Sequence, residues 1–182
     1  MWYPSTVIVA PTTEPVPLDE VKAQCGILPA ETHFNDMLTR LIKAARSHVE
    51  HYCNARWAEQ ALACQCDSFR DFARLSEGPL KSITSVQYVD AAGDTQTLDE
   101  AVYDARKDGL EPSIALKPSQ SWPAIRPGSR ITLTAVFGGD VPAEVHHAML
   151  MFVDDAFHKR ENAKRDDWTA IDVLLCNHRR GA

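Results

Sequence analysis

The stretch SWPAIRPGSRITLTAVFGGDVPAEVHHAML, residues 121–150, carries the strongest structural signals in the chain. Apolar and polar residues alternate over 131–137, which is typical of a strand with one buried face. Gly138-Gly139 then ends the strand. Pro142 suits the first turn of a helix, where its missing N–H leaves no hydrogen bond unmade. We therefore interpret this stretch as a junction between a sheet and a helix, and nothing in its strand resembles a catalytic group.

Short strands are predicted on the N-terminal side of this junction. Residues 57–137 contain runs rich in strand-forming residues, separated by glycine, proline and aspartate. Ala91-Ala92-Gly93-Asp94 is expected to form a hairpin turn. Together these runs predict a compact, mostly antiparallel sheet. The predicted strands cover 59–69, 81–90, 100–107, 112–118 and 129–137.

Two long amphipathic helices are predicted on either side of these strands. The first spans 32–54, with apolar residues at helical spacing and Thr32 as its N-cap. The second spans 142–162. Shorter helices are predicted at 18–26 and from Trp168 to the end of the chain.

This order of segments predicts an α+β fold. A helical body of two long helices, with short helices near each end of the chain, carries an inserted small antiparallel β-sheet. Prolines favour an extended or edge-strand arm at the start, where TVIVA (6–10) is suited to pairing with a sheet of its own chain or of a neighbour. The expected parts are the N-terminal arm over 1–17, the helical body over 18–56 and 140–182, and the β-subdomain over 57–139.

The composition limits the classes of partner. The chain has 182 residues, with 19 basic and 25 acidic side chains and a formal net charge of −6. Proteins that wrap nucleic acid carry basic patches, so this balance argues against many phosphate contacts but leaves room for a surface that DNA slides past. Five scattered cysteines without a secretory signal favour reduced thiols in a cytosolic setting. No apolar run approaches the roughly 20 residues that span a bilayer, so no membrane is expected.

Histidines and cysteines form the sharpest candidate for chemistry. Zinc takes four such ligands, which makes a soluble zinc-binding or hydrolytic domain the alternative interpretation. No CxxC pair is present, and two cysteines two residues apart on a strand share one face, where small buried cysteines are common. We therefore favour a structural role for these residues and expect no catalytic site, no metal and no cofactor. The candidate ligands are His48, His51, Cys53, Cys64 and Cys66.

The chain from residue 15 onward resembles the head–tail connector (adaptor, head-completion) proteins of long-tailed bacteriophages. Within that family it is most similar to the branch with a β-insertion between the two main helices. The most specific features are Ser121-Trp122-Pro123, the strand that ends in Gly138-Gly139, and the helix start VPAE at 141–144. The other pieces are PVPLDEVKAQCGI (15–27), DMLTRLIKAARSHVEHYCNARW (36–57), GPLKSITSVQYVDAAGDTQTL (78–98) and AIDVLLCNHRR (170–180).

The resemblance implies a structural role without enzymatic activity. Copies of such a protein form a homo-oligomeric ring, expected to be a dodecamer, below the portal protein. The ring extends the channel through which double-stranded DNA passes without specific binding, and it joins the head to the stopper or tail-completion protein. The implied location is the neck of the virion, with assembly in the host cytoplasm. The C-terminal segment would dock on the portal through Trp168, Ile171, Leu174, Leu175, Arg179 and Arg180.

Overall fold

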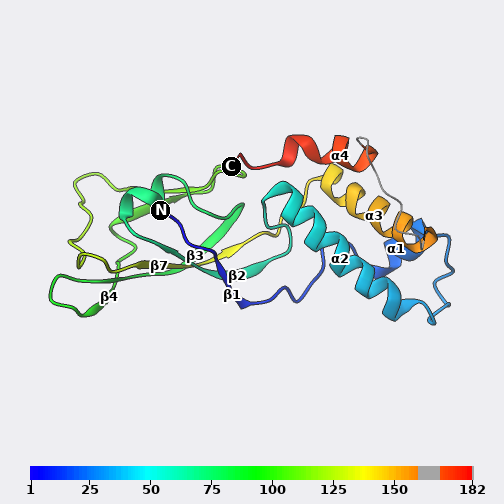
Figure 1. Ribbon diagram of the computed structural model, residues 1–182, viewed down its shortest axis with the longest axis horizontal. Coiled ribbons are helices and arrows are strands. Elements are labelled where there is room, and N and C mark those ends of the chain that lie inside the picture. The colour runs from blue at the N-terminus through cyan, green and yellow to red at the C-terminus, as the bar shows by residue number, and fades with distance from the viewer. Residues whose placement is uncertain (160–168, 182) are drawn as a thin grey trace. The chain divides into compact units, whose positions relative to one another are not determined.

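A computed structural model of the protein describes residues 1–159 and 169–181, and Figure 1 shows the path of the chain. The chain divides into two compact units. One contains Met1–Thr12 and Glu59–Gly138, and the other contains Thr13–Ala58 and the described residues from Gly139 onward. The first unit is built mainly from strands and the second from helices, which confirms the mixed α+β class.

The main sheet of the strand unit has five antiparallel strands in the order β1-β2-β7-β3-β4, so that β1 and β4 are its edges. β2 and β7 pair along their whole length, from Gln60↔Phe137 to Cys66↔Ile131. Buried and half-buried residues alternate along both strands, because one face of the sheet packs on the core. The strands are β1 (Thr6–Val9), β2 (Gln60–Cys66), β3 (Leu80–Val89), β4 (Thr95–Thr97) and β7 (Ile131–Phe137).

Two features of this unit differ from the prediction. The strand predicted over 59–69 ends at Cys66, and Phe69–Ala73 form a 3₁₀ turn, η1, whose first turn is closed by a capping box between Ser68 and Asp71. In addition, β5 (Tyr103–Arg106) and β6 (Ser113–Leu116) pair with each other in a separate two-stranded sheet. The described strands after residue 59 therefore belong to two sheets rather than one.

The helical unit is centred on α2 (Asn35–Cys53) and α3 (Ala143–His158), which pack against each other. The short helix α1 (Leu18–Gln24) contacts both of them, and α4 (Ala170–Leu175) packs mainly on α3. A 3₁₀ turn, η2 (Cys176–His178), follows α4. Within the residues that the structure describes, no helix is both long and apolar enough to cross a membrane.

The predicted N-cap of the long first helix is wrong. The helix begins at Asn35, and the residue before it is Phe34, which makes no side-chain capping bond. Thr32 instead lies in the preceding turn, where its carbonyl accepts a hydrogen bond from the Asn35 N–H at 3.0 Å. At the other end, Asn54 adopts a left-handed conformation with φ of 51° and ends the helix.

The adjacent glycines at the end of β7 have backbone conformations that other residues rarely adopt. Gly138 has φ of 84° and Gly139 has φ of 119°. The Gly138 N–H donates to Pro79 at 3.0 Å, and the Gly139 N–H donates to Trp57 at 3.1 Å. The chain passes from the strand unit to the helical unit between these two residues.

Candidate partner-binding surfaces

Strand β1 is an apolar edge of the main sheet. Its residues pair only with β2 among the described strands, in the register Thr6↔Ala63 and Val7↔Leu62, with a bulge between Val7 and Val9. All four residues of β1 are exposed. The side chains of Val7, Ile8 and Val9 are 51%, 54% and 54% exposed, so that apolar groups are solvated on a strand that also presents an open backbone edge.

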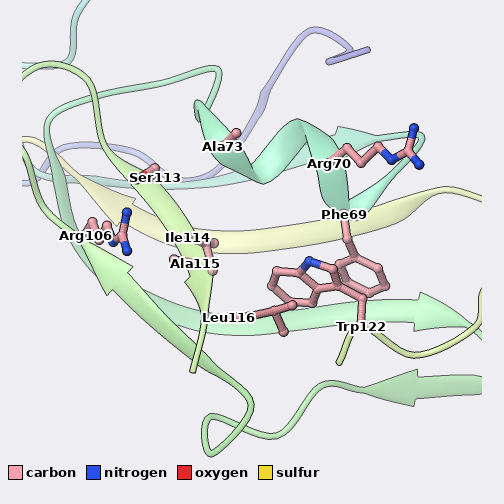
Figure 2. A pocket seen from close by; sticks show the side chains of 9 residues that line it. All are labelled: Phe69, Arg70, Ala73, Arg106, Ser113, Ile114, Ala115, Leu116 and Trp122. Carbon is pink, nitrogen blue, oxygen red and sulfur yellow. The ribbon is translucent and has the colours of Figure 1, made fainter. Parts of the chain in front are cut away.

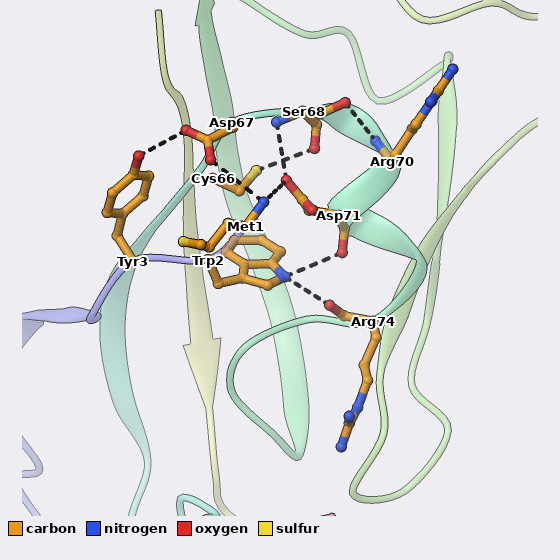
Figure 3. Close-up of polar contacts among 9 residues, drawn as sticks. All are labelled: Met1, Trp2, Tyr3, Cys66, Asp67, Ser68, Arg70, Asp71 and Arg74. Atoms are coloured by element: carbon orange, nitrogen blue, oxygen red, sulfur yellow. Dashed lines mark hydrogen bonds and ion pairs between the residues drawn. The ribbon is translucent and has the colours of Figure 1, made fainter. Parts of the chain in front are cut away.

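The residues before β1 are held firmly on the strand unit (Figure 3). The Trp2 indole N–H points at two backbone carbonyls of the η1 segment, those of Arg74 at 2.8 Å and Asp71 at 3.2 Å. Its ring stacks on Phe72 with the ring centroids 6.0 Å apart. The ammonium group of Met1 lies 2.8 Å from the Asp71 carboxylate. An aromatic anchor with a satisfied polar atom therefore fixes the start of the chain.

Further contacts continue this attachment toward β1. The Tyr3 backbone N–H donates to Gln65 at 2.9 Å, and its hydroxyl donates to Asp67 at 2.9 Å, as Figure 3 shows for the latter. The Ser5 hydroxyl donates to Glu77 at 2.6 Å. Residues 1–9 are therefore ordered on their own sheet. The sequence identified TVIVA as a strand but not these anchors, because they come from residues more than sixty positions away.

Helix α4 in the C-terminal segment begins with a complete capping box. The Thr169 backbone N–H and hydroxyl donate to the Asp172 carboxylate at 2.8 and 2.6 Å, and the Asp172 N–H donates back to the Thr169 hydroxyl at 3.3 Å. Hydrogen bonds from Thr169 lower the pKa of Asp172 below its usual value of 3.8, and one from Tyr52 adds to this effect. The box therefore stabilises a helix of only six residues.

The predicted docking residues of this segment fall into two groups. Ile171, Leu175 and Arg180 are buried, and the Arg180 backbone N–H donates to Cys53 at 2.8 Å. Leu174 is half-buried and Arg179 is exposed. The sixth predicted residue, Trp168, lies outside the described residues.

Two further observations describe the surface of the C-terminal segment. The Arg179 guanidinium lies over the Tyr52 ring, 5.0 Å from its centroid. Val173, which the prediction did not include, is 60% exposed. It lies two positions from both Ile171 and Leu175, about 200° around the helix, and this spacing places it opposite the buried face. The solvent-accessible residues of the C-terminal segment thus include Val173, Leu174 and Arg179.

A pocket of about 340 Å³ lies between η1, β6 and the loop that precedes β7 (Figure 2). Its wall contains Phe69 and Trp122, whose rings stack in parallel with centroids 4.7 Å apart. Trp122 also makes an edge contact with Phe72 at 5.8 Å. Figure 2 shows that the Arg70 side chain extends away from the indole. The pocket therefore lies at the edge of a cluster of packed aromatic side chains, and this packing helps to hold the loop in place.

The five candidate zinc ligands do not gather into a site. Cys64 and Cys66 lie in the core of the strand unit, whereas His48, His51 and Cys53 lie on α2. Burial raises the pKa of the Cys66 thiol to about 12 and that of Cys53 to about 11, which favours protonated thiols. Among residues 1–159 and 169–181, no group of three or more His, Cys, Asp or Glu side chains is arranged to hold a metal ion.

The sequence matches no family profile and no curated protein. Solved structures nevertheless share the fold over almost the whole chain. In "Neck of empty GTA particle computed with C6 symmetry", a chain with 16% identity has a TM-score of 0.81, and the alignment covers 99% of this chain and 97% of that chain.

Two further structures agree. In "Virion of native gene transfer agent (GTA) particle", the identity is 17%, the TM-score 0.80, and the coverage 98% of this chain and 96% of that chain. In "Neck of native GTA particle computed with C12 symmetry", the corresponding values are 18%, 0.75, 99% and 97%. At these identities the likeness is one of fold.

Proposed function

We propose that this protein is a structural subunit in the neck of a phage-like particle. The observation that carries the proposal is the fold shared over 99% of this chain and 97% of a chain from the neck of a gene transfer agent particle. Because the match covers both chains almost completely, it includes the helices as well as the sheets. One fold can serve several functions, so the specific contacts must come from the surfaces described above.

Within the neck, we assign the protein to an adaptor ring between the portal protein and the stopper or tail-completion protein. The ring would consist of identical copies, twelve in our proposal, joined by contacts of one type that close on themselves. Similar chains come from necks computed with C12 and with C6 symmetry, and a ring of twelve copies is compatible with both. The protein would assemble in the host cytoplasm and remain in the neck of the virion.

The charge of the chain supports a conduit for double-stranded DNA. A lumen that held DNA through many lysine and arginine contacts would release counterions and slow its passage. A net charge of −6 favours a surface that DNA passes without specific binding. Neither catalysis nor a cofactor is needed for this role.

We assign portal docking to the exposed side of the C-terminal segment, which contains Val173, Leu174 and Arg179. An apolar side chain that is 60% exposed on a capped helix suits an anchor that enters a pocket of the portal. Deleting residues 168–182 would also remove Ile171 and Leu175, which are buried within the helical unit. A point substitution therefore separates docking from folding better than a truncation.

The test is Val173→Asp in cells that produce the particles. We expect about tenfold fewer heads joined to tails, because a carboxylate buried in an apolar contact costs more than 1.4 kcal/mol. Ala44→Asp, an exposed position on α2, is the matched control and should leave the yield unchanged. Electron microscopy counts completed particles, and circular dichroism of both purified variants checks the fold. Incorporation of the folded Val173→Asp variant at the normal level would contradict this docking surface.

A further inference from the structure

The outer edge of β1 is prepared for pairing with another strand. No described strand occupies it, and Val7, Ile8 and Val9 are each more than half exposed. Proteins usually protect an edge strand with charged side chains or prolines within it. β1 has neither, although a bulge lies between Val7 and Val9. The bulge redirects the side chains locally, but it leaves the apolar groups in solvent.

The distribution of charge indicates what occupies this edge. Residues 1–13 form the longest run in the sequence without a charged side chain. Each copy of the chain carries a net charge of −6, so identical copies repel each other. A contact between copies is favoured where charge is absent, and the surface of β1 meets this condition. A strongly charged partner such as DNA would find no complementary group there.

The anchors before β1 lower the entropy cost of such a contact. Trp2 and Tyr3 hold the segment on the sheet through indole, backbone and hydroxyl hydrogen bonds, and Ser5 adds a bond to Glu77. A strand that is already extended loses little conformational freedom when a second strand pairs with it. Main-chain hydrogen bonds then supply affinity, and the exposed apolar side chains supply buried area.

We propose that β1 pairs through its outer edge with a second copy of this chain, and thereby forms part of the contact between neighbouring subunits of the ring. This inference rests on the proposed function, because the proposed ring consists of identical copies that must contact one another. The contact would be heterologous: β1 of one copy meets a different surface of its neighbour, as ring closure requires.

The direct test uses a photo-crosslinking amino acid in place of Thr6, an exposed residue of β1. Particles that contain this variant are irradiated, and the products are separated by mass. We expect a product of twice the 20.2 kDa chain mass that contains only this protein. The same probe at Leu28, an exposed apolar residue of the helical unit, is the position control. A Thr6 product that contains a different protein, or no Thr6 product from assembled particles, would overturn the proposal.

A substitution tests the same contact energetically. Ile8→Lys places a charge on the edge and should reduce incorporation into particles about tenfold. Leu28→Lys makes the same chemical change at a site that is 66% exposed and should incorporate normally. An unchanged thermal midpoint for the isolated Ile8→Lys protein shows that the fold is intact. If the wild-type chain is absent from purified particles, the proposed function fails as well; if it is present and Ile8→Lys incorporates fully, only the β1 contact is wrong.

Discussion

At the scale of single residues, Glu50 is a buried carboxylate of the helical unit with several polar partners. Its side chain is 4% exposed. Its carboxylate accepts hydrogen bonds from the backbone N–H groups of Trp57 at 2.9 Å and Ala58 at 3.1 Å, and from the Arg46 guanidinium at 3.2 Å. Arg46 also donates to Glu14 at 2.7 Å. One buried carboxylate thus fixes the segment that follows α2.

We predict that Glu50→Ala lowers the free energy of unfolding by about 3 kcal/mol, because it leaves two buried N–H groups and a guanidinium without their shared acceptor. Glu14→Ala removes the more exposed acceptor of the same arginine and should cost less than about 1 kcal/mol. Urea unfolding of both variants measures the difference. Equal costs would show that the Glu50 hydrogen bonds do not stabilise the fold.

Residue patterns also show where sequence reasoning succeeded. Alternation correctly placed Cys64 and Cys66 on one buried face of β2. The predicted strand ran three residues too far, because Phe69 is as apolar as a strand residue, whereas Ser68 and Asp71 form a capping box that begins a 3₁₀ turn. The local pattern therefore identified the buried face but extended the element by one short turn.

At the scale of elements, α4 depends on its cap. A helix of six residues is too short to be stable by itself, so the interactions at its first turn decide whether it forms. The sequence predicts the helix but not its tertiary contacts, because those contacts join residues that are far apart in the chain. Tyr52 forms a hydrogen bond with Asp172, and the Cys53 carbonyl accepts one from the Arg180 N–H. Both residues lie on α2, more than one hundred residues earlier in the chain.

We predict that Thr169→Ala lowers the free energy of unfolding by about 1 kcal/mol at neutral pH. The pKa of Asp172 is lower in the folded protein than its usual value of 3.8, so its stabilisation is present above that pH and is lost as the pH falls through the folded pKa. The difference between Thr169→Ala and the wild type should therefore shrink in acid. Thr39→Ala, at an exposed position on α2, is the control. A difference that stays constant from pH 7 to strong acid would contradict this role for Asp172.

At the scale of the whole molecule, the chain passes between its two units after Thr12, Ala58 and Gly138. The last of these points coincides with the glycine pair that sequence reasoning selected as a junction. Pairing of residues 6–10 with the chain's own sheet was one of two predicted alternatives. The anchoring of the residues before them was not predicted, because it depends on Trp2 and Tyr3 reaching partners more than sixty residues away. Local periodicity carries no information about such contacts.

We predict that Gly139→Val destabilises the protein by about 2 kcal/mol, since a β-branched residue is strained at φ of 119°. Asp140→Val, at the next exposed position, is the matched control and should change the free energy of unfolding by less than about 0.5 kcal/mol. Denaturant unfolding followed by circular dichroism compares the two variants. Similar stabilities would mean that the backbone at this junction adapts without cost.

The stacking of Trp122 on Phe69 has a consequence for evolution. Two residues secure the loop between β6 and β7: the Trp122 ring stacks on Phe69, and Ile125 forms a backbone bridge with Asp90 and packs on the core. The loop residues that make neither contact are less constrained. Substitutions and small insertions there can accumulate by drift, while an exchange of the tryptophan itself would be selected against. Chains that share this fold at 16–18% identity are therefore expected to differ widely in this loop and still retain one aromatic residue that inserts beside η1.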